Sequence, residues 1–445
     1  MIIAVLAIAL VGASCGNAKT AGPSDATKVT APTDGGEANR NTHVAISGVP
    51  GVNDKTISYT VAGTKQNNPL GSCILDCYLA GINAYFDYRN SQGGIYGRKL
   101  AVGAVVDDQL ANNQTEALAI ASDKNVFGSF QAGLLQGGWG ELDKAGVPTY
   151  TWGIDGSSAA NRSAIFPSTV ISCIECTRHM IPYSAMVTGS KRVGALGYGI
   201  SQNSKLCAES IGKSLKLYEK DTGAKLAYLK NDLPYGLPNG IGPEVTAMKK
   251  AGVDFIAGCF DLNGMKTLAQ ELKRQGMSSV VLNHPNSYNQ DFISAAGGLF
   301  EGDIVGVVFR PFEATQNPAL RAFKTWMAKA GSPLTELAMV GWINATLAYE
   351  GLLAAGPRFD RAKVLAGTNA MTKFTANGLI SAIDWTTAHK PYTEATRSKV
   401  ADPECGVIVK VENSRFQSIA PKDKPWLCWT TADTSWSTPV PTNFN

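Results

Sequence analysis

Short apolar runs alternate with longer amphipathic stretches along most of the chain. In the first third, the apolar runs predict strands, and the stretches between them carry apolar residues at helical spacing. The expected strands are residues 43–48, 101–106, 126–130 and 147–152, and the expected helices are 73–88, 110–122 and 136–144. Strands and helices that alternate with short connections are typical of a parallel sheet covered by helices.

A second alternation of the same kind follows. Its expected strands are 193–198, 225–229, 253–260 and 280–282, and its expected helices are 178–187, 203–219, 244–251 and 263–276. Two such series predict an α/β protein with two Rossmann-like lobes, each with a central parallel sheet, rather than one very wide sheet. Residues 291–379 are again mainly helical, and this segment is expected to return to the first lobe.

The start of the chain differs from the rest. Its apolar run, residues 2–11, is much shorter than the roughly 20 residues of a membrane-spanning helix, and it predicts a signal segment over residues 1–14. Residues 10–16, LVGASCG, match the pattern in which small residues precede a lipidated cysteine. We therefore expect Cys15 to anchor an extracytoplasmic protein to the cell membrane, with residues 15–42 as a flexible tether. An ordinary secretory signal with a chance cysteine is the alternative.

Composition narrows the classes of function. Hydrophobic residues make up 44% of the 445 positions and charged residues 17%, and 40 Lys+Arg against 36 Asp+Glu give a net charge of +4. This balance does not favour a nucleic-acid partner, which calls for a clustered basic face.

Nine cysteines fit an exported chain. Without Cys15 they number eight, an even number in a space that permits disulfides. Three pairs lie close in sequence, and two cysteines are then left to pair across the fold: Cys73 with Cys77, Cys173 with Cys176, Cys405 with Cys428, and Cys207 with Cys259. The sequence does not fix this connectivity. A zinc half-site, Cys173-x2-Cys176-x2-His179, is the alternative, but no second ligand pair lies nearby.

Loops after the expected strands carry the candidate binding residues. In open α/β sheets, ligands bind at the carboxyl ends of the strands, and a cleft between two lobes is a common site for a small molecule. The candidates are Gln131, Ala132, Gly133, Leu134, Tyr150, Trp152 and Asp155 in the first lobe, and Tyr198, Gln202, Asp261, Asn263 and His284 in the second. For several of them a structural role is the alternative. The two aspartates could cap helices, the aromatic residues could pack in a core, and the histidine could be a satisfied loop residue.

Catalytic motifs are missing from the sequence. It contains no G-x-S-x-G elbow, no phosphate-binding G-x-x-x-x-G-K-[ST] loop and no strand-borne G-x-G-x-x-G. The four histidines have no obvious Ser or Cys partner. We therefore expect a binding protein rather than an enzyme, with no cofactor and no metal.

One stretch carries a family resemblance. Residues 84–90 (AYFDYRN), 93–100 (GGIYGRKL) and the pair Asp107-Asp108 together resemble the leucine/isoleucine/valine-binding protein family, the extracytoplasmic solute receptors of ABC importers. The resemblance extends over residues 43–385. It implies two lobes that close on a ligand and three hinge crossings, placed here near Ser172, His284 and Ile380. On this basis lobe I comprises residues 43–172 and 285–380, and lobe II comprises 173–284 and 381–445, including a C-terminal extension.

The resemblance also bears on the ligand. The family holds amino acids with a serine-rich loop, a threonine and an acid, and the matching positions here are 132–134, Asp155 and Asn263. All three differ, which favours a more apolar or aromatic solute over a branched-chain amino acid. The expected partners are this solute and the membrane permease subunits, and the expected state is a monomer. A sensor of the same fold that signals to a membrane receptor is the alternative.

Overall fold

The computed structural model describes residues 40–70, 72–153, 156–169, 173–285, 287–390, 393–397, 404–429 and 434–445. Four features expected from the sequence lie outside these residues: the signal segment, the lipidation site Cys15, the candidate Asp155 and the hinge crossing near Ser172. Most of the tether lies outside them as well.

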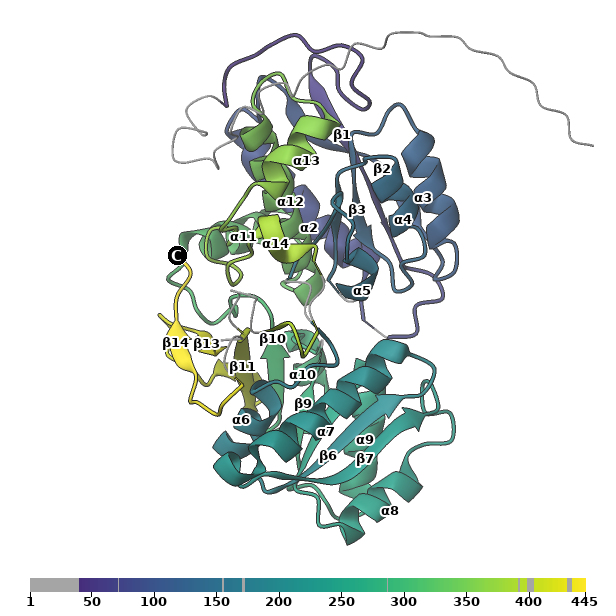
Figure 1. Ribbon diagram of the computed structural model, residues 1–445, viewed down its shortest axis with the longest axis vertical. Helices are drawn as coiled ribbons and strands as arrows, with labels where there is room; N and C mark the ends of the chain where they lie inside the picture. Colours follow the sequence, from purple (N-terminus) through teal and green to yellow (C-terminus); the bar gives the residue numbers. More distant parts are fainter. Residues whose placement is uncertain are drawn as a thin grey trace, which may run out of the picture. The chain divides into compact units, whose positions relative to one another are not determined.

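The first sheet has five strands in the order β2-β1-β3-β4-β5. Figure 1 labels β1, β2 and β3 of this sheet. Every neighbouring pair in it is parallel. Its strands are β1 (Thr56–Gly63), β2 (Lys99–Asp107), β3 (Gly128–Ala132), β4 (Thr149–Thr151) and β5 (Ile165–Pro167).

The expected first strand at residues 43–48 was wrong, because no strand lies there and β1 begins at Thr56. Five consecutive residues at the end of β1 are buried, since strands flank it on both edges and helices cover the sheet. Its hydroxyl-bearing residues, such as Thr60, hide this burial from a search for apolar runs.

Helices from two distant parts of the chain cover the first sheet. Residues 113–159 supply α3 (Asn113–Ser122), α4 (Trp139–Lys144) and α5 (Gly156–Ala159), while α2 (Leu75–Ser91) packs along α12 (Glu336–Ala355). The close approach of these two helices requires glycine, because a Cβ on Gly81 would collide with the carbonyl oxygen of Ala338, and one on Gly341 with that of Tyr78. Among the later helices, α11 (Pro318–Lys329) and α12 contact α2, and α13 (Arg361–Asn369) contacts α12.

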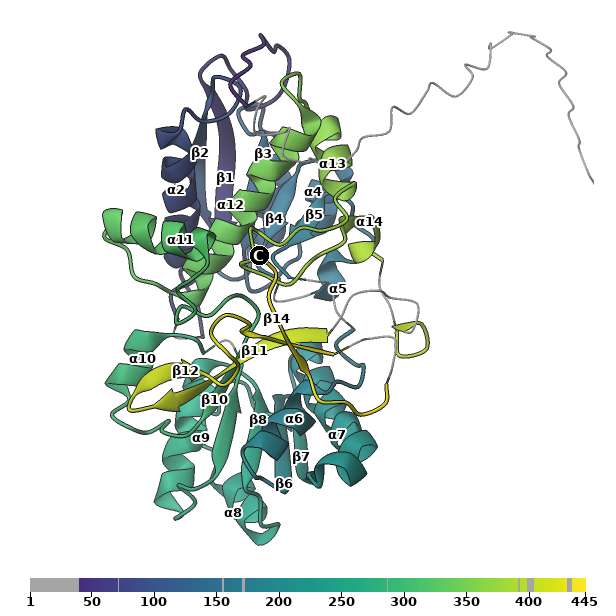
Figure 2. The same ribbon diagram turned by 90° about the vertical axis from the view of Figure 1, so that its left-hand side faces the viewer.

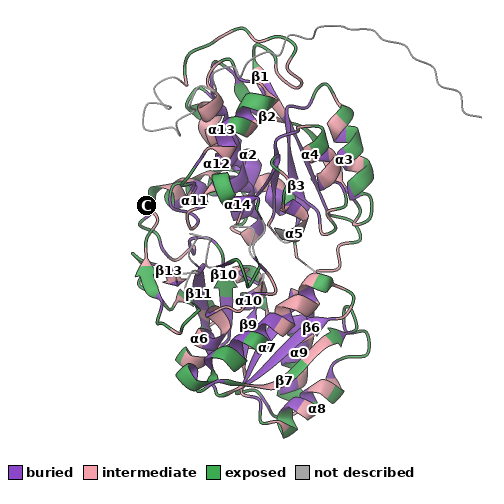
Figure 3. Ribbon diagram, in the orientation of Figure 1, coloured by how far each residue is buried: buried purple, intermediate pink, exposed green. Residues whose placement is uncertain are grey.

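Among the described residues, α12 alone is long and apolar enough to cross a membrane by composition. It is instead a core helix, with 83% of its apolar window buried. Buried residues (purple in Figure 3) continue from it into the strands of the first sheet.

The second sheet has nine strands (Figure 2). Eight follow the order β14-β13-β11-β10-β9-β8-β6-β7, and β12 pairs with β11. The strands are β6 (Arg192–Tyr198), β7 (Lys225–Leu233), β8 (Phe255–Cys259), β9 (Val281–His284), β10 (Ile304–Val307), β11 (Glu404–Glu412), β12 (Arg415–Ser418), β13 (Trp426–Trp429) and β14 (Val440–Thr442). Its helices are α6 (Met180–Val187), α7 (Gln202–Thr222), α8 (Gly242–Lys250), α9 (Leu262–Arg274) and α10 (Gln290–Ala295).

Two segments lie in the other lobe from the one expected. Strand β10 pairs with β9 in the second sheet, although residues 285–380 were assigned to the first lobe. Helix α14 (Trp385–Ala388) was assigned to the second lobe, but Trp385 packs on Phe166 of β5 with ring centroids 5.1 Å apart. Both segments are short, so neither carries enough periodicity to reveal its lobe. The remaining lobe boundaries stay predictions.

The C-terminal extension completes the second sheet. Strand β11 runs antiparallel to β10, and β13 runs antiparallel to β11. Beyond β14, the side-chain oxygen of Asn445 accepts hydrogen bonds from Arg310 (3.0 Å) and Asn317 (2.7 Å), and Arg310 also donates to the carbonyl of Gly378 (2.7 Å). The last residues are therefore held by residues 310–317, which are themselves bonded to Gly378.

Four disulfides form, and they join the cysteines as grouped above: Cys73–Cys77, Cys173–Cys176, Cys207–Cys259 and Cys405–Cys428. The zinc half-site is thereby ruled out, because its two cysteines are bonded to each other. Within the described ranges, no group of three His, Cys, Asp or Glu side chains could hold a metal ion.

Candidate functional site

The candidate residues of the first lobe lie where β3 and β4 end. Gln131 and Ala132 are the last residues of β3, and the backbone N–H of Trp152 donates to the carbonyl of Gln131 (2.9 Å). Gln131 is buried and donates through its amide to the hydroxyl of Ser129 (2.6 Å). The ends of β3 and β4 are therefore joined by hydrogen bonds within the protein.

The loop after β3 is held by a buried polar network. The hydroxyl of Thr64 donates to Asp108 (2.7 Å) and accepts the backbone N–H of Leu134 (3.1 Å). A Cβ on Gly133 would stand 2.6 Å from Asp108, so only glycine fits there. The backbone N–H of Leu134, one of the candidate binding residues, thus already has a partner within the protein.

The paired aspartates after β2 have structural roles. Asp108 is fully buried within this network and also accepts from the side chain of Asn113 (3.3 Å). Asp107 accepts backbone N–H groups of Lys65 and Gln66 at 2.9 and 3.0 Å. Burial would raise the pKa of Asp107, but these hydrogen bonds lower it below its usual value. The sequence identified the pair but not its partner Thr64, which lies just beyond the missed strand β1.

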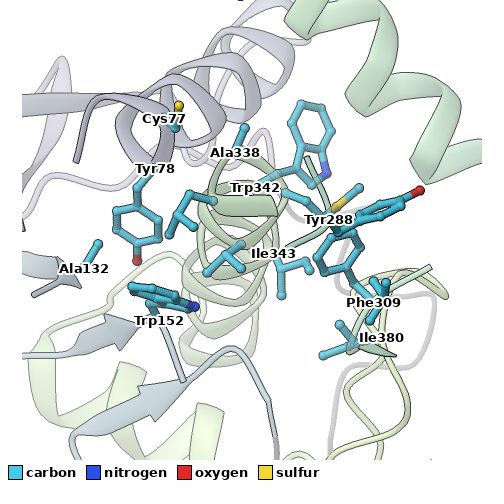
Figure 4. Packing of buried hydrophobic residues seen from close by; sticks show 14 of the residues in the cluster. Cys77, Tyr78, Ala132, Trp152, Tyr288, Phe309, Ala338, Trp342, Ile343 and Ile380 are labelled. Carbon is cyan, nitrogen blue, oxygen red and sulfur yellow. The ribbon is translucent and has the colours of Figure 1, made fainter. Parts of the chain in front are cut away.

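The two aromatic candidates of the first lobe differ in position. Tyr150 has no exposed surface and lies between Phe130 and Phe166, with ring centroids 5.3 and 5.7 Å away. Trp152 belongs to the cluster of buried residues in Figure 4, together with Tyr78 of α2 and Ile343 of α12. We remove Tyr150 from the candidate site, because its ring is enclosed by the aromatic core.

The strand ends of the second lobe bring a phenol and a carboxylate together. The Tyr198 hydroxyl at the end of β6 donates to Asp261 (2.6 Å) after β8. The other oxygen of Asp261 accepts the backbone N–H groups of Asn263 (3.0 Å) and Gly264 (3.1 Å) and so caps α9. Burial, followed by the hydrogen bond to Asp261, raises the pKa of Tyr198. A Cβ on Gly264 would stand 2.5 Å from the Tyr198 hydroxyl, so glycine permits this pair.

Two further aromatic rings pack against Tyr198 of that pair. The ring of Tyr198 lies 5.2 Å from Tyr235 and 5.2 Å from Phe260. Tyr235 is 43% exposed, and the nearby loop after β6 presents Ile200, which is 79% exposed. Sequence reasoning missed Tyr235 because it ended the strand before it at residue 229, whereas β7 continues to Leu233.

The remaining candidates of the second lobe are dispersed. Gln202 is exposed in the first turn of α7, where Ser201 caps the helix by accepting the N–H of Ser204, and Asn263 is exposed in the first turn of α9. His284 is buried and hydrogen-bonded to Asp303 (2.8 Å), and its ring packs edge-on against Phe300. We remove His284 from the candidate site, because its ring is buried and its Nε2 is bonded to Asp303, so its position is structural.

The structure therefore gathers the candidates into two groups, one at each sheet. Gln131, Ala132, Leu134 and Trp152 adjoin at the first, and Tyr198, Asp261 and Asn263 adjoin at the second. A surface hollow of about 730 Å³ coincides with neither group, because it lies at the amino ends of strands in the second sheet, whereas the candidates lie at the carboxyl ends.

Comparison with known protein families identifies the family of this chain. A sequence profile described as periplasmic binding protein matches residues 71–400. The chain belongs to the periplasmic binding protein family. Proteins of this family are extracytoplasmic and bind solutes rather than catalyse reactions, and the resemblance found in the sequence is confirmed. Comparison with curated proteins gave no match.

Solved periplasmic binding proteins share the fold. A branched-chain amino acid ABC transporter protein from Thermus thermophilus with bound valine is 17% identical, with a TM-score of 0.64 over 85% of this chain and 97% of that one. A fatty acid ABC transporter substrate-binding protein from Thermomonospora curvata is 18% identical, with a TM-score of 0.62 over 89% and 98%. A solute-binding protein from R. palustris in complex with 4-hydroxybenzoate is 17% identical, with a TM-score of 0.64 over 82% and 96%. At these identities the likeness shows the two-lobed α/β fold and no more.

Proposed function

We propose that this periplasmic binding protein is the lipid-anchored receptor of an ABC importer and holds a small organic solute between its two lobes. It acts as a monomer and delivers the solute to the membrane permease subunits. The observation that carries the proposal is the pair formed by Tyr198 and Asp261, which lies beside exposed aromatic and aliphatic side chains at the strand ends of the second sheet. Strand ends are where ligands bind in sheets of this kind.

The proposed solute is more apolar or aromatic than a branched-chain amino acid. The carboxylate of Asp261 already accepts a phenol and two backbone N–H groups, which leaves it less able to balance a buried ammonium group. Tyr235, whose exposed ring packs on Tyr198, and the exposed side chain of Ile200 offer apolar surface that suits an aromatic or aliphatic body. Solved proteins of this fold carry valine in one case and 4-hydroxybenzoate in another, so the architecture accommodates both classes.

Ligand identification tests the proposal directly. Native mass spectrometry of the purified protein, followed by calorimetry with the solute that co-purifies, is expected to give one apolar or aromatic compound bound one to one. Leucine or valine as the tightest ligand would contradict the proposed solute class. The absence of any bound small molecule, with no calorimetric response to amino, aromatic or fatty acids, would contradict the function itself.

A pair of tyrosine variants tests the site. Tyr198→Phe removes the hydroxyl that contacts Asp261 and is expected to weaken solute binding by roughly 10-fold, since one hydrogen bond to a charged group is lost. Tyr183→Phe removes the same group from α6, where the ring packs on Trp429 (5.4 Å), and is expected to leave affinity unchanged. Equal solute affinities of the two variants would show that Tyr198 does not belong to the solute-binding site.

The anchor is tested separately. Cys15→Ser is expected to release the protein from the membrane fraction, and mass spectrometry of the wild-type amino terminus is expected to show a lipid on Cys15. Wild-type protein that is soluble after export would contradict the anchor and leave solute binding untouched.

A further inference from the structure

A basic hollow lies at the amino ends of the strands of the second sheet, whereas the candidate site described above lies at their carboxyl ends. It has a volume of about 730 Å³. Five basic residues and one acidic residue line it together with a glycine: Lys191, Arg192, Lys216, Lys220, Lys225, Glu219 and Gly223. Arg192 begins β6 and Lys225 begins β7, so the hollow opens at the amino ends of these parallel strands.

The positive charge of the hollow is not neutralised. None of its five basic side chains forms an ion pair with a residue in the described part of the chain. The nearby carboxylate of Asp254 accepts the backbone N–H groups of Lys191 and Arg192 instead of their charged groups. Five basic residues and one acidic residue line this hollow, an excess of four positive charges. The net charge of the entire chain is also +4, so the residues outside the hollow carry equal numbers of positive and negative charges.

Local structure explains only part of this cluster. Lys220 lies in the last turn of α7, where a cation stabilises the helix end. Lys191, Arg192 and Lys225 lie on strand starts and have no such role. Gly223, which also lines the hollow, is the left-handed C-cap residue of α7. Arg192 is held in place by its hydrogen bond to the carbonyl of Ala251 (2.6 Å).

We propose that this hollow binds phosphate-rich anions. Several cations that converge on one concave surface, with no ion pair to a described residue, form a favourable field for an anion of several charges. Lysine and arginine are the side chains that recognise phosphate, lysine as a point charge and arginine through its planar fork. A soluble polyphosphate and the packed headgroups of an anionic membrane share this chemistry. The site is separate from the proposed solute site, because the two lie at opposite ends of β6.

Two probes distinguish the sources. Purified protein in 0.15 M salt is titrated with tripolyphosphate by calorimetry, and is sedimented with vesicles of phosphatidylglycerol and phosphatidylcholine. Binding to tripolyphosphate alone assigns the hollow to a soluble anion, and binding to vesicles alone assigns it to a membrane surface. The proposal is overturned if the wild-type protein binds neither probe.

Two double variants with the same change in charge locate the binding. Lys216→Glu/Lys220→Glu reverses two charges within the hollow and is expected to weaken binding roughly 30-fold or more. Lys250→Glu/Lys273→Glu reverses two exposed charges in the last turns of α8 and α9, outside the hollow, and is expected to weaken binding less than about 3-fold. Circular dichroism and melting curves confirm that both variants fold. An equal loss in the two variants would show a diffuse charge effect and overturn the site.

Discussion

The two sheets of this protein differ in strand direction and in the segments of the chain that build them. The first is parallel throughout, and helices α2 and α12 seal it with large apolar side chains. In the second, parallel pairing ends at β10, and antiparallel strands from the far end of the chain extend the sheet.

Hydrogen bonds of buried histidine side chains are distributed unequally between these two regions. The second holds two buried histidine–carboxylate pairs, His179 with Glu404 and His284 with Asp303, whereas neither ring nitrogen of His389, which packs on Phe166 of the first sheet, has a partner among the described residues. Apolar packing suffices where helices cover both faces of a sheet. A strand that joins late from a distant segment needs bonds that fix its register. The four predictions below test this contrast.

The largest effect is expected from Glu404→Ala. Glu404 of β11 accepts the ring Nδ1 of His179 (3.0 Å) and the backbone N–H groups of His179 and Met180 at the start of α6. Burial would raise the pKa of Glu404, but these bonds to His179 lower it. Losing the carboxylate leaves buried donors unpaired and is expected to reduce the free energy of unfolding by about 3–5 kcal/mol in urea titrations at pH 7.

A second glutamate on the same strand provides the control. Glu412 is exposed and forms a surface ion pair with Lys410 (2.9 Å), so Glu412→Ala should cost less than about 1 kcal/mol. Similar losses for the two variants would contradict the role given to the buried pair.

Disulfides are expected to differ between the regions as well. Cys207–Cys259 closes a separation of 52 residues in the second lobe, and Cys73–Cys77 closes 4 residues at the start of α2. Replacing both cysteines by alanine should lower the free energy of unfolding by about 4 kcal/mol for the first pair and about 2 kcal/mol for the second, because a longer loop constrains the unfolded chain more. The reverse order in urea titrations would show that native-state strain outweighs loop length.

Acid should weaken the first region before the second. Burial lowers the pKa of His389 to about 4, from about 6.5 when unfolded, and Asp143 opposes this shift only in part. A base with a lowered pKa contributes stability above its unfolded pKa. Roughly 3 kcal/mol is therefore lost as the pH falls from 6.5 to 4. The contribution of Glu404 has the same sign but a lower pH range: its pKa is lowered, so its stabilising effect is lost only as the pH falls below the unfolded value of about 4.5.

Hydrogen exchange at pH 5 reports on each region. Peptides that cover residues 385–390 should gain exchange relative to pH 7, while those that cover 404–412 should not. His389→Phe should abolish the change, because the replacement cannot be protonated. A pH response that persists in this variant would assign it to another group.

The smallest effect concerns a hydrogen bond between layers of the first lobe. The Tyr78 hydroxyl donates to the carbonyl of Tyr150 (3.1 Å) and accepts the amide of Asn344 (2.6 Å). Tyr78→Phe should therefore cost about 1–2 kcal/mol in thermal unfolding. Tyr59→Phe is the matched control, because the Tyr59 hydroxyl is buried without a partner in the described structure, and its removal should be neutral or stabilising.

The sequence predicted the features that depend on local periodicity. Helix α9 appeared from Met265, Leu268, Ala269 and Leu272, all of which are buried on one face. The strand ends that hold Gln131, Trp152 and Asp261 followed from the alternation of strands and helices. Spacing grouped Cys73 with Cys77 and Cys173 with Cys176 without fixing the connectivity, and the structure joins both pairs.

Features that depend on distant partners were missed. Strand β10 is only four residues long and exists because β9 and β11 pair with it on either side. The side chain of His284 is directed by Asp303, a residue outside its own strand, so its position after a strand suggested a ligand contact that the fold does not provide. Tyr235 depends on where β7 ends, and single-sequence patterns locate such ends only to within a few residues.

Helix α12 has a consequence for the route of the protein to its site of action. The family is extracytoplasmic, so a 20-residue segment with the length and apolar character of a membrane anchor must pass through the export channel without being released into the bilayer. Asn344, near its middle, and Glu350 lower its affinity for lipid. The same Asn344 that links helix layers in the folded state thus also helps the unfolded chain to cross the membrane, and replacing it with leucine would make the segment a better stop-transfer signal.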